Sequence, residues 1–178
     1  MSFYNYFDEA QREILRERAR RVATAAQENN TIAVREVLLA RVQNERYMLP
    51  VEAVLAVYEN ALVTPIPCVP AFVAGLVNLR GHLVPVLDLA SLLNVTRSPD
   101  QVASTIVVAA AHDYQVGLLV DQANDVQAIA EEQILPVPIT LELGHETYLQ
   151  GVTVEGVALL NLHAILSDPA LNVDQQLA

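Results

Sequence analysis

The stretch Val37 to Val51, VLLARVQNERYMLPV, contains two apolar runs separated by the polar pair Asn44-Glu45. Short Val- and Leu-rich runs on either side of a polar turn predict two β-strands joined as a hairpin. The same order of features returns in Ile106 to Val120, IVVAAAHDYQVGLLV, where His112-Asp113 takes the place of the turn. The chain therefore contains an internal repeat, and each copy begins with a hairpin.

The features that follow each hairpin also recur in the same order. A tyrosine, a Pro-x-Pro segment, an aromatic residue with glycine three positions later, a hairpin turning at glycine and an Asx-Leu pair appear in both copies. They lie at Tyr47, Pro65–Pro67, Phe72, Gly75, Gly81 and Asp88-Leu89, and again at Tyr114, Pro136–Pro138, Tyr148, Gly151, Gly156 and Asn161-Leu162. Two copies are too few for a solenoid, so the repeat predicts two similar small units.

This pattern predicts a mostly β fold of two similar five-stranded, SH3-like β-barrels packed together. Closing each sheet into a barrel protects edges that so apolar a chain could not leave exposed. We expect the polar segment Asn94 to Ala103 to join the two barrels. Both faces of Val37–Val42 and Thr105–Ala111 are apolar, so these strands are expected to lie between two layers. A third core between the barrels would account for them.

Residues 1–34 follow a different pattern. Leu15, Ala19, Val22 and Ala26 are spaced at i, i+4, i+7 and i+11, which predicts a helix over Asp8 to Ala26. Its apolar stripe is thin, so this helix is expected to dock, either on its own domain or on a partner protein. The predicted organisation is a helical extension (1–34), a domain (35–170) with copies at about 35–93 and 104–166, and a tail (171–178).

The net charge of −11 is unevenly distributed along the chain. All ten basic residues are arginines, and ten acidic residues balance them as far as Arg97. The remainder carries eleven acidic residues and neither arginine nor lysine. Because affinity for phosphates requires Lys or Arg, we expect no nucleic-acid partner.

The mean hydropathy of +0.31 raises the question of a membrane segment. The longest uncharged run, Asn60 to Leu79, is interrupted by three prolines, whereas a spanning helix needs roughly 20 continuous apolar residues. The N-terminus has Arg and Glu where the apolar part of a secretory signal would lie. The single cysteine, Cys68, cannot form an internal disulfide, as is typical of a reducing compartment. We therefore predict a cytoplasmic protein without direct membrane insertion.

We find no sequence pattern that indicates a catalytic, metal or cofactor site. The four histidines lack metal-site spacing, and no phosphate-binding glycine loop or Gly-x-Ser-x-Gly motif occurs. Asp88 follows a predicted strand, as a catalytic carboxylate would, but Asn161 takes the matching place in the second copy. Asn caps a helix as well as Asp does, so we expect Asp88 to be a cap. Asp121 and Asp125 are predicted to be solvated turn residues.

Arg80 is the charged residue that is hardest to explain by the fold. It lies in VNLRGHLVPVLDL, Val77 to Leu89, at the tip of the hairpin that turns at Gly81. The second copy has Val154-Glu155-Gly156 at this place, so the shared fold does not require an arginine. Two interpretations remain open. Arg80 either forms an internal salt bridge, for example with Glu52 or Glu59, or presents its planar guanidinium to a binding partner.

The segment Phe72 to Leu89 resembles the signature of the CheW family of bacterial chemotaxis coupling proteins. The family pattern is an aromatic residue, a glycine, Asn-Leu-Arg-Gly (here Asn78–Gly81), an apolar pair, proline and a final Asp-Leu. The resemblance runs from about Glu36 to Leu166 and includes Gly117–Asp121 and Asp125-Val126. It implies a CheW-like domain with a double-barrel architecture, in agreement with the repeat.

The resemblance implies a non-enzymatic adaptor that links methyl-accepting chemoreceptors to a CheA-type histidine kinase. The partners would be the signalling tip of the receptor and the regulatory domain of the kinase, with the adaptor in the cytoplasm at membrane receptor arrays. No cofactor, metal or catalytic residue is implied. Carried over by motif, Arg80 with Asn78 and Gly81 would contact the receptor, and Val54 lies on a strand that aligns with receptor-facing positions.

One departure from the family pattern affects this expected surface. The family usually has a glutamate two positions after the residue matching Val54, able to pair with the motif arginine, and here that position is Ala56. Glu59 or Glu52 would have to substitute. With the helical extension, this departure points to a variant pathway such as pilus-based motility or phototaxis. The alternative from another class is a small-molecule-binding enzyme built on a double β-barrel.

Overall fold

The structure, a computed structural model, describes residues 33–98, 102–111, 114–137 and 146–169. The chain falls into two units, Met1–Ala33 and Val34–Ala178, and every described residue except Ala33 belongs to the second unit. The predicted N-terminal helix, the turn at His112-Asp113 and the predicted tail lie outside the described residues.

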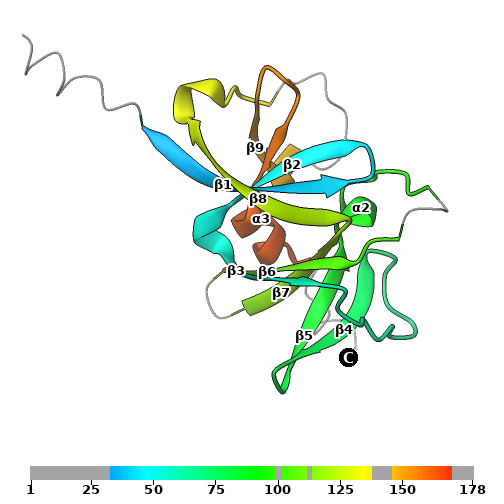
Figure 1. The fold of residues 1–178 in the computed structure, drawn as a ribbon. Coiled ribbons are helices and arrows are strands. Elements are labelled where there is room, and N and C mark those ends of the chain that lie inside the picture. The colour runs from blue at the N-terminus through cyan, green and yellow to red at the C-terminus, as the bar shows by residue number, and fades with distance from the viewer. Residues whose placement is uncertain (1–32, 99–101, 112–113, 138–145, 170–178) are drawn as a thin grey trace, which may run out of the picture. The chain divides into compact units, whose positions relative to one another are not determined.

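The described strands form two five-stranded sheets (Figure 1). The first sheet has the order β8-β1-β2-β10-β9, and the second has the order β3-β6-β7-β5-β4. The strands of the first are β1 (Val34–Val42), β2 (Glu45–Pro50), β8 (Gln122–Ala130), β9 (Leu149–Val152) and β10 (Ala158–Leu160). Those of the second are β3 (Val54–Glu59), β4 (Val73–Leu79), β5 (His82–Asp88), β6 (Thr105–Ala111) and β7 (Tyr114–Val120). The prediction of a mostly β fold with two five-stranded units is therefore confirmed.

The two sheets do not follow the two sequence copies, because each sheet combines strands from both. The hairpin β1–β2 joins the first sheet through parallel pairing of β2 with β10, and the hairpin β6–β7 joins the second through parallel pairing of β7 with β5. The first hairpin of each copy thus lies beside the last strands of the other copy. The apolar pattern of a strand shows which of its faces are buried, but not which strand lies beside it.

The expectation that the segment Asn94 to Ala103 joins the two sheets is wrong. The strands on either side of it, β5 and β6, both belong to the second sheet. The chain instead crosses between sheets at the 3-10 turn η2 (Val51–Ala53) and at Asp121, which separates β7 from β8. Both crossings are short and occur directly after the hairpin that is exchanged.

The Pro-x-Pro and glycine features of the first copy have a common structural cause. Thr64, the residue before Pro65, forms an isolated antiparallel bridge with Leu76 of β4. Proline has no N–H to continue such pairing. A Cβ on Gly75 would lie 2.1 Å from the Thr64 carbonyl oxygen. The missing side chain therefore lets the backbone of the bridge approach β4.

The second copy repeats this arrangement. Leu135, the residue before Pro136, bridges Val152 of β9, and a Cβ on Gly151 would lie 2.7 Å from the Leu135 carbonyl oxygen. In both copies the bridge follows one edge strand of a sheet and pairs with the strand at its other edge. Both features of the repeat are thus explained by the same close backbone contact.

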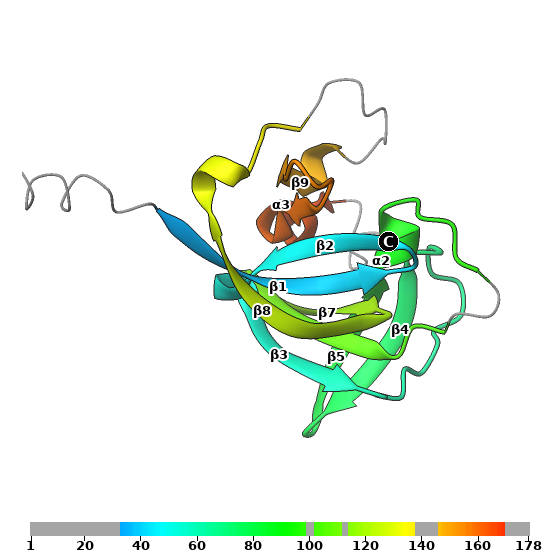
Figure 2. The same ribbon diagram turned by 45° about the horizontal axis from the view of Figure 1, so that its top comes forward.

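The buried hydrophobic residues that the structure describes form three clusters, as expected from strands that are apolar on both faces. One part belongs to the first sheet, one belongs to the second sheet, and the largest is shared by both sheets and the helices α2 (Leu89–Leu92) and α3 (Leu162–Ser167) (Figures 1 and 2). Neighbouring residues of one strand enter different parts. Val37 lies in the core of the first sheet and Leu38 in the shared core, while Ile106 and Val107 divide likewise in the second sheet. The expectation that these strands lie between two layers is confirmed.

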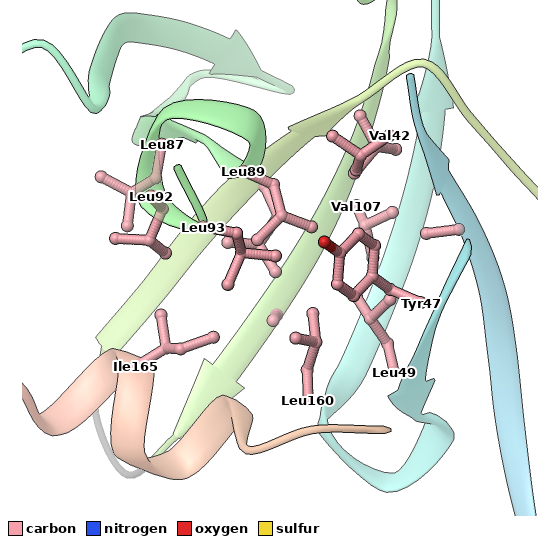
Figure 3. Close-up of a cluster of buried hydrophobic side chains, with 14 of the residues drawn as sticks. Val42, Tyr47, Leu49, Leu87, Leu89, Leu92, Leu93, Val107, Leu160 and Ile165 are labelled. Atoms are coloured by element: carbon pink, nitrogen blue, oxygen red, sulfur yellow. The ribbon is translucent and has the colours of Figure 1, made fainter. Parts of the chain in front are cut away.

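Figure 3 shows the shared core, in which the ring of Tyr47 lies among aliphatic side chains that include Leu49, Val107 and Leu160. Leu49, Val107 and Leu160 have no exposed area. Burial of large aliphatic side chains contributes about 1.5–3 kcal/mol each, so this shared core is the main attraction between the sheets. Among the helices that the structure describes, none is long and apolar enough to cross a membrane.

Candidate functional site: an exposed arginine at a hairpin tip

The hairpin of β4 and β5 ends in a tip that projects from the second sheet (Figures 1 and 2). Leu79 pairs with His82, so Arg80 and Gly81 are the two turn residues. Both have positive φ angles, 53° and 91°, as a type I′ turn requires. The Oδ1 atom of Asn78 accepts a hydrogen bond of 2.8 Å from the Gly81 amide. The structure therefore brings together the three motif residues Asn78, Arg80 and Gly81.

Arginine is an unusual choice for the first position of this turn. Gly, Asn and Asp dominate the positions with positive φ in type I′ turns, and a larger residue there costs on the order of 1 kcal/mol. Gly81 supplies the second position, where a Cβ would meet nothing within 4 Å. The turn thus carries a guanidinium at a conformational cost, which turn formation by itself does not require.

The guanidinium of Arg80 is exposed and is not used inside the described part of the fold. Within the described ranges, the ion pairs of arginine involve Arg35 and Arg97, and Arg80 pairs with neither Glu52 nor Glu59. Among the described residues, Arg80 therefore does not form the internal salt bridge that was one of its two interpretations. A free guanidinium with five N–H donors remains available to a carboxylate outside the domain.

Val54 has a different position from the three turn residues. It is the first residue of β3, at the opposite end of the strand order from β4, and it is half-buried against the shared core. Ala56 also faces inward and packs against the core of the second sheet. The alanine that replaces the family glutamate therefore has apolar neighbours.

The outward face of β3 carries apolar residues that sequence reasoning missed. Leu55 is 55% exposed and Val57 is 37% exposed, and they alternate with half-buried residues along the strand. Period-two alternation places Leu55, Val57 and Glu59 on one face of β3. All four residues from Val54 to Val57 are apolar, so the sequence does not distinguish the outward face of this strand from the buried one.

The prediction that Asp88 is a helix cap is confirmed. Its carboxylate accepts a hydrogen bond of 3.3 Å from the Ala90 amide at the start of α2. Asn161 does the same at α3, accepting a bond of 3.0 Å from the Ala164 amide. Comparison of the two copies thus assigned the role of Asp88 correctly.

The prediction that Asp121 and Asp125 are solvated turn residues is wrong for Asp121 in its burial and for Asp125 in its place. Asp125 is exposed, but it lies within β8, where it pairs with Leu39 of β1. The side chain of Asp121 is 6% exposed and forms an ion pair with Arg97, with 3.0 Å between Nη1 and Oδ1. It also accepts a hydrogen bond of 2.5 Å from the Gln43 amide. Gln43, Arg97 and Asp121 are far apart along the chain, so no local pattern indicates that they meet.

Two buried tyrosines have hydroxyl groups that bond to carboxylates. Tyr47 donates to Glu45 and Tyr148 donates to Asp168. Burial, together with the neighbouring carboxylate, raises the pKa of Tyr47 above its ordinary value. Burial and the bond to Asp168 raise the pKa of Tyr148 to about 12. Both groups stay protonated and act as donors at neutral pH.

One hollow of the described surface is a cavity of about 540 Å³. It lies between the β1–β2 turn, the segment after α2 and the β9–β10 hairpin, and Glu45, Arg46 and Glu155 are its charged lining residues. The described residues of its lining include no His, Cys or Ser. Among the described residues, no three His, Cys, Asp or Glu side chains form a group that could hold a metal ion.

Comparisons with known proteins agree with the motif. Residues 36–170 match the family model described as CheW-like domain. Chemotaxis protein CheW of Rhizobium meliloti (strain 1021) is 30% identical over 145 residues, which cover 80% of this chain and 94% of that protein. Protein FrzA of Myxococcus xanthus is 30% identical over 135 residues, which cover 74% of this chain and 84% of that protein.

A solved structure shows the same fold. The scaffolding protein TtCheW from Thermoanaerobacter tengcongensis superposes with a TM-score of 0.68 at 24% identity, covering 78% of this chain and 96% of that one. The resemblance seen in the segment Phe72 to Leu89 is confirmed, and the enzyme alternative has no support. The chain belongs to the CheW-like family and is a non-enzymatic adaptor of chemotaxis-type signal transduction.

Proposed function

We propose that this adaptor couples the signalling tip of methyl-accepting chemoreceptors to the regulatory domain of a CheA-type histidine kinase. The receptor-binding residues would be Arg80, Asn78 and Gly81 at the hairpin tip, together with Val54 on β3. Signalling would pass by differential binding, in which the receptor state changes the free energy of the kinase states through two separate interfaces on the adaptor. Such a role needs no reacting group.

The observation that carries this proposal is the exposed guanidinium of Arg80 on a rigid turn. Pairing with a partner's carboxylate would combine charge with directed hydrogen bonds. Asn78 holds the turn through the Gly81 amide, so its contribution would be to orient Arg80. Val54 is half-buried, so its contribution would be to support the exposed Leu55 and Val57 beside it.

The test is the affinity of the adaptor for a soluble fragment of a receptor signalling tip, measured by calorimetry. Arg80→Ala is expected to weaken binding by roughly 1–2 kcal/mol, or about tenfold, with unchanged thermal stability. The matched control is Arg46→Ala, which removes an exposed arginine from β2 of the first sheet. Normal receptor affinity of a folded Arg80→Ala variant would contradict the proposed site, and failure of the wild-type protein to bind both receptor and kinase would contradict the proposed function.

We infer that each sheet is closed as an SH3-like barrel, since the bridges Thr64–Leu76 and Leu135–Val152 link the two edges of each sheet. The domain would span 35–170, with a helical extension over 1–34. The adaptor would act in the cytoplasm at membrane receptor arrays. The replacement of the family glutamate by Ala56 supports a variant motility pathway, such as pilus-based motility or phototaxis.

A further inference from the structure

Arg97 lies between two carboxylates at the ends of β5 and β7, which are neighbouring parallel strands of the second sheet. Its Nη1 atom is 3.0 Å from Oδ1 of Asp121, and its Nη2 atom bonds Oδ1 of Asp88. We propose that Arg97, its partners Asp88 and Asp121, and the neighbouring Gln43 and Ser98 fix the alignment of the two sheets. We call this group of polar contacts the clasp. The proposal does not depend on which partner the adaptor binds.

Of the two carboxylates, that of Asp121 lies at a place where the chain passes between the sheets. Asp88 is the last residue of β5 in the second sheet and caps α2. Asp121 is the residue at which the chain leaves β7 of the second sheet and enters β8 of the first. The amide of Asp121 also donates a bond of 3.0 Å to the carbonyl of Arg41 in β1. The guanidinium of Arg97 therefore joins the segment after α2 to Asp121, the residue at which the chain passes from the second sheet to the first.

Gln43 closes the clasp from the other side. It lies in the turn between β1 and β2, has a positive φ of 58° and is 4% exposed. The backbone amide of Gln43 donates a hydrogen bond of 2.5 Å to Oδ2 of Asp121, and its side-chain Oε1 accepts a bond of 2.8 Å from the Ser98 backbone amide. Ser98 follows Arg97 directly. The contacts Arg97–Asp121, Asp121–Gln43 and Gln43–Ser98 thus form a closed ring.

Most of the described contact between the sheets is the apolar shared core, which lacks this directionality. Hydrophobic attraction depends on buried area and is not directional, so the shared core draws the sheets together without fixing one alignment strongly. Hydrogen bonds to charged groups have defined lengths and angles. The clasp supplies that geometry at one end of the shared core. Its removal leaves the carboxylate of Asp121, which is 6% exposed, without its cation.

The clasp also holds two walls of the 540 Å³ cavity. The residue after Gln43 is Asn44, which lines the cavity together with Tyr47. From the segment after α2, Val95 also lines the cavity, two positions before Arg97. Release of the clasp should therefore loosen both walls together, while the centre of each sheet stays intact.

Amide hydrogen exchange of the full chain, followed by NMR, tests the clasp directly. Arg97→Ala should speed exchange at the Gln43 and Ser98 backbone amides by at least about tenfold relative to the buried Val107 amide of β6, because both amides bond within the ring of contacts that Arg97 completes. Arg97→Lys should restore part of this protection, since one ammonium cannot place separate parallel donors on both carboxylates.

The matched control is Arg35→Ala. Arg35 pairs with Glu131 at 3.4 Å and bonds Gln150, but these partners all belong to one side of the fold, the first sheet and the turn after β8. Its loss should leave the exchange of Gln43 and Ser98 unchanged. If Arg97→Ala does not fold, Arg97→Gln decides in the same assay. Exchange that rises equally at Gln43, Ser98 and Val107, or does not rise at all, would overturn the clasp.

Discussion

Gly75→Ala should destabilise the adaptor strongly, although it adds a single methyl group. The backbone of Gly75 has a φ of 143°, a conformation that L-residues with a side chain rarely adopt. A Cβ would lie 2.1 Å from the Thr64 carbonyl oxygen, 2.7 Å from its carbonyl carbon and 2.9 Å from the Pro65 Cα. These are backbone atoms, so no side chain can rotate away to relieve the contact.

The magnitude follows from the contacts that must be lost. Moving Thr64 away breaks both bonds of its bridge to Leu76, which measure 2.8 and 2.9 Å. Each bond contributes about 1 kcal/mol net, and the strained backbone costs a further 1–3 kcal/mol or so. We expect a loss of about 3–5 kcal/mol. That is a large part of the roughly 5–15 kcal/mol by which a domain is typically stable.

Urea denaturation followed by circular dichroism measures this loss. The matched control is Gly81→Ala, which also places alanine at a positive φ, 91°, but where a Cβ would meet nothing within 4 Å. The control isolates the conformational cost, and the difference of about 2 kcal/mol between the variants reports the bridge. If Gly75→Ala costs no more than Gly81→Ala, the explanation of the glycine by close backbone approach is refuted.

Three further measurements test the core, the caps and the buried tyrosines. Leu49→Ala should cost about 2–5 kcal/mol in urea denaturation, because Leu49 has no exposed area in the shared core; a cost below 1 kcal/mol would argue against a tightly packed core. Asn161→Ala should lose about 1 kcal/mol with the cap of α3, and Asn161→Asp should keep most of it. The free energy of unfolding should fall as pH rises from about 10. The pKa of Tyr148 is raised to about 12 in the folded chain, so the unfolded chain releases this proton first. Tyr148→Phe should flatten this fall, and an unchanged slope would contradict the assignment of the fall to Tyr148.

The sequence was sufficient to predict local chemistry wherever the repeat supplied a comparison. The cap role of Asp88 followed from Asn161, and the special status of Arg80 followed from the absence of an arginine beside Gly156. The three-part core followed from strands that are apolar on both faces. In each case a periodic pattern or a matched position carries the physical information directly.

The sequence could not predict which hairpin lies in which sheet or which polar side chains meet across the fold. Exchange of the first hairpins changes the neighbours of β2 and β7 without changing the apolar pattern of either strand. Asp121 looked like a solvated turn residue because its partners, Gln43 and Arg97, are distant in sequence. Burial of a turn carboxylate depends on what packs over it, and that is decided by the tertiary fold.

In each copy a polar contact holds the segment that follows the short helix, α2 in the first copy and α3 in the second. The contact differs between the copies, which explains why only one of them needs an arginine there. In both, the carbonyl of the aromatic residue accepts a bond from the Asx amide, 2.8 Å from Asp88 to Phe72 and 2.7 Å from Asn161 to Tyr148. In the second copy the Tyr148 hydroxyl then reaches Asp168, just beyond α3. Phe72 has no hydroxyl, so it cannot do this for the first copy. There the anchoring group beyond α2 is Arg97, and it bonds the carboxylate of Asp88, where the second copy has the neutral Asn161. An arginine enclosed by carboxylates therefore belongs to the fold, whereas the exposed Arg80 at the hairpin tip forms no ion pair with the residues that the structure describes.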